Sequence, residues 1–208
     1  MISPRLLLKA SLLVVTIFLL GPGSGIARDS GDGFDTVKRV VNIFSVWGGK
    51  EPNKNLLKEL TSYIDYNEMA ERSLGKYWFD LTPLDRREYA FVFRKLVEDR
   101  YYPRWRKIFS RGKIEKIKEV DTADSLYVKT AFRLGDKEDV IVWRLSKRSR
   151  PIKIVSITVD DKDLLTRMSI RVQKQMKKNG YKKLMAWMKD RAELEESKIE
   201  SLRSTAAK

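Results

Sequence analysis

The sequence contains no cysteine and no histidine. Without cysteine there can be no disulfides, so burial of apolar side chains has to hold the fold together. Most zinc sites and most general-base or triad mechanisms use histidine or cysteine, and these two absences remove both residue types. A carboxylate-based enzyme stays open, but the composition favours a binding protein that is not an enzyme. We expect no metal and no cofactor.

Long apolar runs are also absent, except near the start of the chain. Arg5 and Lys9 precede the uncharged run Ala10–Leu20, and small residues follow as far as Ala27. This is the layout of a secretory signal peptide. The run is shorter than the roughly 18–20 apolar residues that a membrane-spanning helix needs. We therefore expect residues 1–27 to be a cleaved signal peptide and the mature protein to reside in the periplasm.

Positive charge exceeds negative charge along the chain. Lys and Arg number 43 against 28 Asp and Glu, which gives a formal net charge of +15. A charge of this size favours anionic partners, either nucleic acid or anionic lipid surfaces. Because the periplasm holds little nucleic acid and much anionic membrane, we expect a lipid partner and no nucleic acid. The basic runs 104–107, 147–150 and 174–183 are then interpreted mainly as solvated faces.

Apolar residues recur at helical spacing over about 34–110. The clearest helix begins at Thr82, an N-cap residue followed by Pro83 at the first helical position. Its apolar face predicts a long helix against the core. Pro103 is predicted to end or kink this helix near Tyr102, since proline lacks the backbone N–H and its ring clashes one turn back.

The period then changes to that of strands. Four β-rich runs joined by short turns fill about 113–160, which predicts an antiparallel meander with apolar residues on both faces. Helix returns at about 163–190, with Asn179-Gly180 as a stop, and 191–208 is a charged C-terminal tail. The predicted fold class is α+β: one domain over 28–190 with a four-stranded antiparallel sheet covered by helices.

The segment Asp65–Trp78, DYNEMAERSLGKYW, resembles a signature of the MlaC-type, or toluene-tolerance, family of periplasmic phospholipid-binding proteins. That family shows an aromatic residue after the Asp, then Met-Ala, Leu-Gly and Trp at these offsets. Thr82-Pro83 before Tyr89, and Asn179-Gly180-Tyr181 late in the chain, continue the similarity. The resemblance covers roughly Phe34 to Met188.

The resemblance implies a helical layer over a curved sheet, with an apolar pocket between them for the acyl chains of a bound phospholipid cargo. It also implies a carrier that exchanges lipid between an outer-membrane lipoprotein complex and an inner-membrane ABC transporter with its MCE-domain protein. Such a carrier maintains outer-membrane lipid asymmetry and hydrolyses nothing. A hopanoid or another apolar lipid would fit the same kind of pocket.

Candidate residues for the pocket lining are apolar or aromatic and come from the long helix, the later strands and the last helix. They are Phe93, Leu96, Val97, Tyr101, Trp105, Val142, Val155, Ile157, Leu165, Met168 and Val172. Ordinary core packing is the alternative role for each of them. Arg100 falls close to the apolar face of its helix, where a guanidinium is costly unless it is paired or near water. We hypothesise that Arg100 lies at the pocket mouth and contacts a lipid phosphate; a salt bridge or a position past the helix end are the alternatives.

Two further functions stay open. Asp65, Glu68 and Glu71 are the carboxylates from which an acid–base enzyme site could be built, although Asp65 and Glu68 suit helix capping better. No set of nucleophile, base and orienting group can be assembled around them. A basic periplasmic module that binds acidic partners is the other alternative.

Overall fold

The structure, a computed structural model, describes residues 31–47 and 54–192. The expected signal peptide at 1–27 lies outside the described residues, as does all but the beginning of the expected tail at 191–208. Among the described residues, no helix is both long enough and apolar enough to cross a bilayer.

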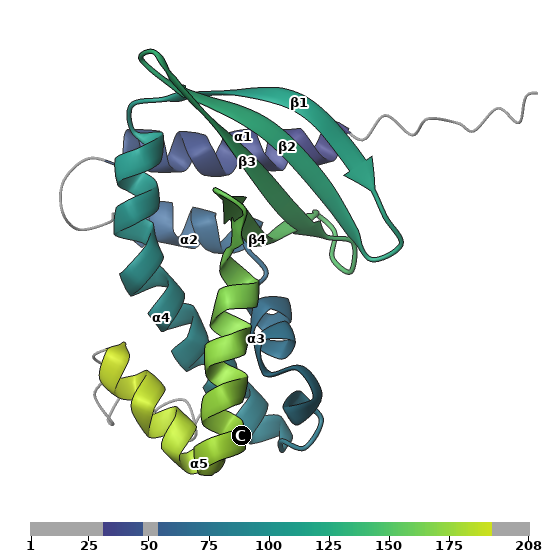
Figure 1. Cartoon of the computed structure of the whole chain (residues 1–208), viewed down its shortest axis with the longest axis vertical. Coiled ribbons are helices and arrows are strands. Elements are labelled where there is room, and N and C mark those ends of the chain that lie inside the picture. The colour runs from purple at the N-terminus through teal and green to yellow at the C-terminus, as the bar shows by residue number, and fades with distance from the viewer. Residues whose placement is uncertain (1–30, 48–53, 193–208) are drawn as a thin grey trace, which may run out of the picture.

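The described chain has an α+β fold in which helices precede and follow a single sheet (Figure 1). The helices are α1 (Gly31–Val46), α2 (Lys54–Tyr63), α3 (Tyr66–Leu74), the short 3₁₀ helix η1 (Gly75–Trp78), α4 (Pro83–Phe109) and α5 (Leu164–Arg191). The strands are β1 (Lys113–Asp121), β2 (Ser125–Leu134), β3 (Lys137–Ser146), β4 (Lys153–Val159) and β5 (Lys162–Asp163). The predicted class and order of elements are confirmed.

The sheet is an antiparallel meander in the order β1-β2-β3-β4-β5, so it has five strands and not the predicted four. The additional strand, β5, has two residues and pairs with the end of β4. Asp160 and Asp161, both with positive φ, turn the chain back at this point. A strand of two residues is too short to show the alternation of period two by which strands are predicted.

Helix α1 packs across one face of the sheet, and Figure 1 shows it running behind β1, β2 and β3. Val37, Val40 and Phe44 of α1 are fully buried there. The opposite face is covered mainly beside β4, where α3 and α5 approach. Val120 and Val140 are each more than 40% exposed on that opposite face. The face toward α1 is therefore covered except near its edge, where Leu134 is 42% exposed, and the opposite face is covered in part.

Helix α4 does not end at Pro103, so of the two predicted effects of this proline, an end or a kink, the end is wrong. Thr82 caps the start of α4 by accepting from the Asp85 N–H, as predicted, but the helix continues through Pro103 to Phe109. An internal proline costs about 3 kcal/mol in lost hydrogen bonding and ring clash. Tyr102 and Trp105, which flank Pro103, are buried against the rest of the core, and that burial holds the last turns in place.

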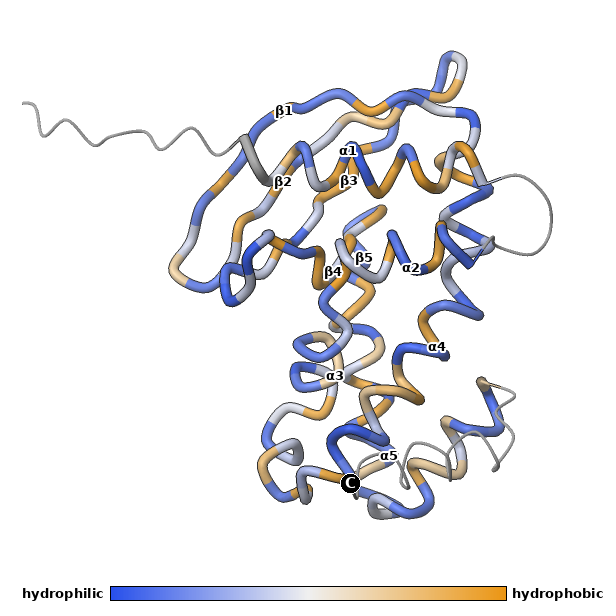
Figure 2. The backbone as a smooth tube through the Cα atoms, turned by 180° about the vertical axis from the view of Figure 1, so that it is seen from behind, coloured by the Kyte–Doolittle hydropathy of each residue, from blue (hydrophilic) through white to orange (hydrophobic). Residues whose placement is uncertain are grey.

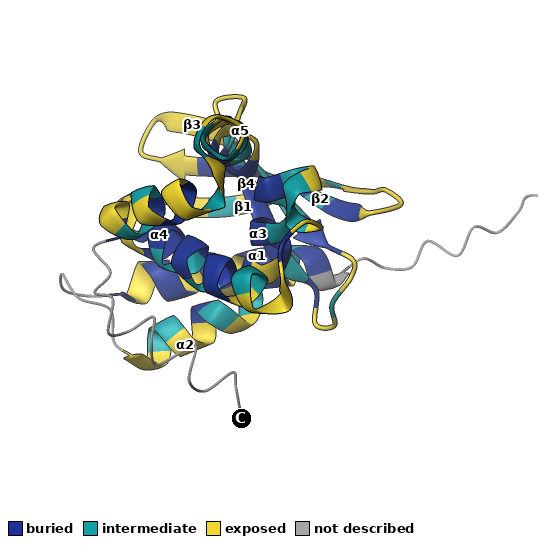
Figure 3. Ribbon diagram, turned by 90° about the horizontal axis from the view of Figure 1, so that it is seen from below, coloured by how far each residue is buried: buried dark blue, intermediate teal, exposed yellow. Residues whose placement is uncertain are grey.

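Helix α5 bends at Gly180, where φ is 74° and ψ is 174°. This left-handed conformation is readily adopted by glycine and rarely by other residues. The predicted stop at Asn179-Gly180 is therefore found as a bend that joins two helical segments. In the view of Figure 3, α4 and the other helices keep their buried residues inward and their exposed residues outward.

The molecule has two parts, which we call the sheet lobe and the helical lobe (Figure 1). The sheet lobe comprises α1, α2, the sheet and the C-terminal end of α4. The helical lobe comprises α3, η1, α5 and the beginning of α4. Figure 2 shows hydrophobic positions interleaved with hydrophilic ones along the strands and helices of both lobes, which is the pattern of elements that each bury one side.

Candidate functional site

Five of the predicted lining residues meet where α4 packs against α5. Leu96, Arg100 and Tyr101 of α4 and Met168 and Val172 of α5 line one groove, together with Arg171, Trp187 and Arg191. We call it the α4–α5 groove. Its volume is about 40 Å³.

Helix geometry brings these residues together. Leu96 and Arg100 are four residues apart on α4, and Met168 and Val172 are four residues apart on α5, so each pair lies on one face of its helix. The bend of α5 at Gly180 turns its last segment so that Trp187 also reaches the groove. Two helices and one bend thus build the groove.

The floor of the α4–α5 groove is apolar. Leu96 is 5% exposed, Met168 is 6% exposed and Val172 is 2% exposed. Trp187 is half-buried beside them. This volume is far below the roughly 300–1,000 Å³ of usual ligand pockets, so the groove as it stands has no room for an acyl chain.

Three guanidinium groups surround this apolar floor. Arg100 and Arg171 are exposed, and within the described part of the chain neither has a carboxylate within salt-bridge distance. Arg191 pairs with its neighbour Asp190, at 4.0 Å, and its guanidinium lies over the Trp187 ring, 4.5 Å from the centroid. Among the described residues the groove therefore combines an apolar floor with a positive rim on which two of the three guanidinium groups have no carboxylate partner, which suits an amphiphile with an anionic head.

The structure places Arg100 on the rim of the groove, in contact with water. Among the described residues Arg100 has no salt bridge, and α4 continues to Phe109, so Arg100 does not lie at the end of its helix either. The predicted contact of Arg100 with a lipid phosphate stays a prediction.

The other candidate residues lie elsewhere in the core. Phe93 and Val97 are fully buried on α4, Val155 and Ile157 are buried on β4, and Leu165 is buried in the first turn of α5. These five pack in the interior and do not line the α4–α5 groove.

Val142 is separated from these core residues. Trp143 pairs with Ile157 across β3 and β4, so these two side chains share the covered face of the sheet. Val142 precedes Trp143 and therefore points to the opposite face, where it is half-buried. The structure does not bring Val142 together with Ile157.

Aromatic side chains fill the space between the sheet and the end of α4. We call Phe44, Tyr102, Trp105, Phe109, Phe132 and Trp143 the aromatic core. Phe44 lies 5.3 Å from Tyr102 and 5.7 Å from Trp105 between ring centroids, and Phe109 lies 5.4 Å from Trp143. These are ordinary packing distances for aromatic pairs. Trp105, a candidate lining residue, belongs to this packed core.

The aromatic core also satisfies its polar atoms. The Trp143 indole N–H donates to Thr130 Oγ1 at 3.0 Å, and Tyr102 shares a short hydrogen bond with Tyr66. Burial raises the pKa of Tyr102 above its ordinary value, so its hydroxyl stays neutral.

The carboxylates considered for an enzyme have structural partners. Asp65 caps α3 by accepting from the Glu68 N–H at 2.9 Å. Glu68 is buried and binds Arg72 at 2.6 Å and the Ser146 hydroxyl, which ties α3 to the end of β3. Glu71 accepts from Arg148 at 3.0 Å on both oxygens. The capping role predicted for Asp65 is confirmed.

Metal-ligating side chains do not gather in the described residues: no group of three or more His, Cys, Asp or Glu there could hold an ion.

Sequence reasoning missed Arg171, Trp187 and Arg191. Arg171 directly precedes the candidate Val172, and a helical projection that includes Met168 would have placed all three on neighbouring positions. Trp187 and Arg191 had no such signal, because their place depends on the angle at which α5 bends at Gly180.

Comparisons with known proteins add the following. The model of the MlaC protein family matches residues 49–190. No curated protein matches the chain. Among solved structures, a phospholipid-binding protein from Ralstonia solanacearum, in complex with a phospholipid, is similar with a TM-score of 0.65 and 14% identity. The alignment covers 78% of this chain and 95% of that chain, and at this identity the likeness concerns the fold.

Proposed function

The chain belongs to the MlaC family, and from this premise we propose that it binds a phospholipid at the α4–α5 groove. The observation that carries the proposal is the combination of three arginines with an apolar floor. A phosphate of the head group would bind Arg100, Arg171 and Arg191, since a guanidinium donates hydrogen bonds in a fork that matches phosphate oxygens.

The acyl chains would enter between α4 and α5. Each buried CH₂ contributes about 0.8 kcal/mol of transfer free energy, so two long chains supply enough to separate two helices. Phe93 and Val97 are fully buried on α4 in the same core cluster as the groove floor, and in this proposal they would contact the chains once Met168 and Trp187 move aside. The predicted pocket between helices and sheet is, in this proposal, a space that the lipid opens.

Gly180 provides the point about which the last segment of α5 can move. Its backbone is already outside the helical region, and a Cβ placed there would meet no atom within 4 Å. A change of angle at Gly180 shifts Trp187 and Arg191 together, because both follow it on the same helical segment. A hinge at Gly180 would therefore move the apolar Trp187 side chain and the Arg191 guanidinium of the rim together.

We also propose that the protein acts as a carrier in the periplasm and not as an enzyme. In this role it takes phospholipid from one membrane to the other, between an inner-membrane ABC transporter complex with an MCE-domain protein and an outer-membrane lipoprotein complex. The net charge of +15 and the signal-peptide layout of residues 1–27 support it. The carboxylates of α3 engaged in capping and ion pairs support it as well.

The arginine rim favours a phospholipid over a hopanoid or another neutral apolar lipid. An uncharged head group would leave three guanidinium groups without an anion and would gain no charge-assisted hydrogen bond. The expected order of affinity is therefore anionic phospholipid, zwitterionic phospholipid, then neutral lipid.

The test is lipid uptake by the purified full chain from vesicles. We would incubate it with vesicles of phosphatidylglycerol, of phosphatidylcholine, and of phosphatidylcholine doped with a hopanoid, then re-isolate the protein and quantify bound lipid. Phospholipid uptake that exceeds hopanoid uptake, and that falls in the Arg100→Gln/Arg171→Gln variant, supports the proposal. Equal uptake of all three lipids, or uptake that the variant leaves unchanged, contradicts it.

A further inference from the structure

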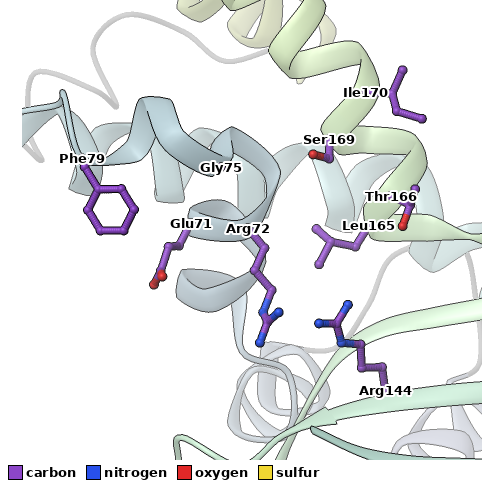
Figure 4. A pocket seen from close by; sticks show the side chains of 9 residues that line it. All are labelled: Glu71, Arg72, Gly75, Phe79, Arg144, Leu165, Thr166, Ser169 and Ile170. Carbon is purple, nitrogen blue, oxygen red and sulfur yellow. The ribbon is translucent and has the colours of Figure 1, made fainter. Parts of the chain in front are cut away.

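A second groove lies on the other side of α5, where α5 begins beside α3 and the end of β3. It has a volume of about 430 Å³. Its lining comes from Glu71, Arg72, Gly75, Phe79, Arg144, Leu165, Thr166, Ser169 and Ile170 (Figure 4). We call it the Arg72–Arg144 groove. None of these residues lines the α4–α5 groove.

Two guanidinium groups from different elements face the same space in this groove. Figure 4 shows Arg72, from α3, and Arg144, from β3, pointing toward each other. Like charges that face one another across a groove repel, and an anion between them relieves the repulsion. Two guanidinium groups stay this close only if neighbouring side chains hold each of them in place.

Each guanidinium is held by its own neighbours. Arg72 uses Nε and one terminal nitrogen to bind Glu68 at 2.6 Å. Arg144 donates from Nε to the Ser125 hydroxyl at 3.2 Å and lies over the Tyr127 ring. The terminal nitrogens of Arg144 have no acceptor in the described part of the chain, and no described carboxylate forms an ion pair with this side chain.

The one carboxylate in the lining is already neutralised. Glu71 accepts from Arg148 on both of its oxygens, at 3.0 Å each. The Ser169 hydroxyl accepts from Gln173 at 2.7 Å, which leaves its proton to donate. Because Glu68 in turn neutralises Arg72, the positive charge at the centre of the groove comes from Arg144, with donor groups of Arg72 and Ser169 beside it.

The two ends of the groove are apolar. Phe79 is 71% exposed and Ile170 is 64% exposed, and they are the two most exposed large apolar side chains in the described residues. An organic substituent attached to an anion would find apolar contacts there, beside the guanidinium groups.

We propose that the Arg72–Arg144 groove is a second anion site, which binds the phosphate of a phosphoester. Two guanidinium groups at an angle supply donors to several oxygens of a tetrahedral phosphate, whereas a planar carboxylate is fully bound by one fork. The phosphoester is either a soluble one or the head group of a lipid at a membrane surface. The site shares no lining residue with the α4–α5 groove, so a failure of the proposed lipid cargo would leave this proposal unaffected.

The experiment uses the full chain carrying Arg100→Gln/Arg171→Gln, so that uptake by the α4–α5 groove does not contribute. Glycerol 3-phosphate is titrated by calorimetry at fixed ionic strength, with acetate as the carboxylate comparison. Co-sedimentation with phosphatidylglycerol vesicles forms the second arm. Arg144→Gln is added in one protein, and Arg133→Gln in a matched control with the same change of charge, since Arg133 lies on the sheet but outside the groove.

Arg144→Gln is expected to weaken phosphoester binding about tenfold, and Arg133→Gln less than about twofold. Binding of glycerol 3-phosphate with this pattern identifies a soluble ligand, and binding of vesicles alone with this pattern identifies a lipid head group. Both results support the site. Equal losses for the two variants, tighter binding of acetate than of glycerol 3-phosphate, or no saturable binding in either arm overturns it. Thermal unfolding checks that each variant is folded. If Arg144→Gln does not fold, Ser169→Ala replaces it and is expected to weaken binding about threefold.

Discussion

The aromatic core and the α4–α5 groove are built from similar residues but differ in how completely they are packed. In the aromatic core, Trp143 is fully buried, its N–H donates to Thr130, and its ring packs against Phe109. In the α4–α5 groove, Trp187 is half-buried beside a small void, on a helical segment that follows a bend. The comparison teaches that stability and the proposed ligand binding use adjacent stretches of the same long helix, α4: the groove takes Leu96–Tyr101, and the aromatic core takes residues from Tyr102 onward.

The physical reason is a difference in how closely the side chains of the two regions are packed. A close-packed aromatic core loses contacts with any displacement, so it resists opening. The α4–α5 groove holds a small void, and it would open by a change of angle at Gly180 that moves the last segment of α5, including the buried Leu184 and Met188. The lipid carrier that we propose would need both properties, and α4 takes part in both regions.

The largest expected effect is on the aromatic core. Trp143→Ala should lower the free energy of unfolding by about 3–5 kcal/mol, because it removes a large buried ring and leaves the Thr130 hydroxyl without its donor. Trp187→Ala is the matched control and should cost only about 1 kcal/mol. Urea denaturation measures both, and equal losses would remove the contrast between the two regions.

The next effect concerns the arginine rim. Arg100→Gln/Arg171→Gln should weaken binding of an anionic phospholipid about 100-fold, roughly tenfold for each charge-assisted contact that is lost. Unfolding should change little, since both side chains are exposed. Arg104→Gln/Lys107→Gln removes the same charge from exposed positions of α4 outside the groove and should leave affinity within about threefold. Titration with a fluorescent lipid measures the affinities. A similar loss of affinity in this control would show that net charge, and not the position of the arginines in the groove, determines binding.

The bend of α5 gives a third, smaller effect. Gly180→Ala places a side chain in a conformation that residues other than glycine rarely adopt, which should cost about 1–2 kcal/mol of stability. Lipid exchange between vesicles should change in rate, because the last segment of α5 sets the position of Trp187. Gly135→Ala is the control, as Gly135 also has positive φ but lies in the turn between β2 and β3. Equal changes in exchange rate for the two variants would exclude Gly180 as a hinge.

The smallest effect is expected at the start of α5. Burial by itself raises the pKa of Asp163, but hydrogen bonds from Ser156, Thr166 and Thr158 outweigh it and hold that pKa below the ordinary value of 3.8. A lowered folded-state pKa means that Asp163 contributes stability above about pH 4 and that this contribution is lost as the pH falls through the folded-state pKa.

Asp163→Ala should therefore cost about 1 kcal/mol near neutral pH, mostly through the lost N-cap. Asp163→Asn keeps a capping side chain and should retain most of the stability while losing its share of the decline below pH 4. Denaturation at a series of pH values measures both variants. An unchanged acid profile in Asp163→Asn would show that other carboxylates cause the decline.

Much of the fold was predictable because its signals are local. Thr82 with Pro83 gives the start of α4, and period two over 113–160 gives the four long strands in nearly correct bounds. The errors arose where tertiary packing overrides local preference. Pro103 stays helical because its neighbours are buried, and β5 exists because a tight turn returns the chain to β4.

The candidate site was predictable only in part, for the same reason. Helical spacing placed Leu96 and Arg100 on one face of α4 and Met168 and Val172 on one face of α5, and the structure brings those faces together. Nothing in the spacing separates core from lining, so the spacing could not say that Phe93 and Trp105 are buried in the core. Val142 lies on the face of β3 opposite Trp143, and whether it contacts a lipid stays a prediction.

The central claim is that the α4–α5 groove binds a phospholipid through its arginine rim. Native mass spectrometry of the protein purified from bacterial cells, followed by lipid extraction, tests it most directly. We predict a stoichiometric adduct with the mass of a phospholipid in the natural protein, and its loss in the Arg100→Gln/Arg171→Gln variant. A natural protein that carries no lipid and takes none up from phospholipid vesicles, or a variant that keeps the full adduct, would contradict the account.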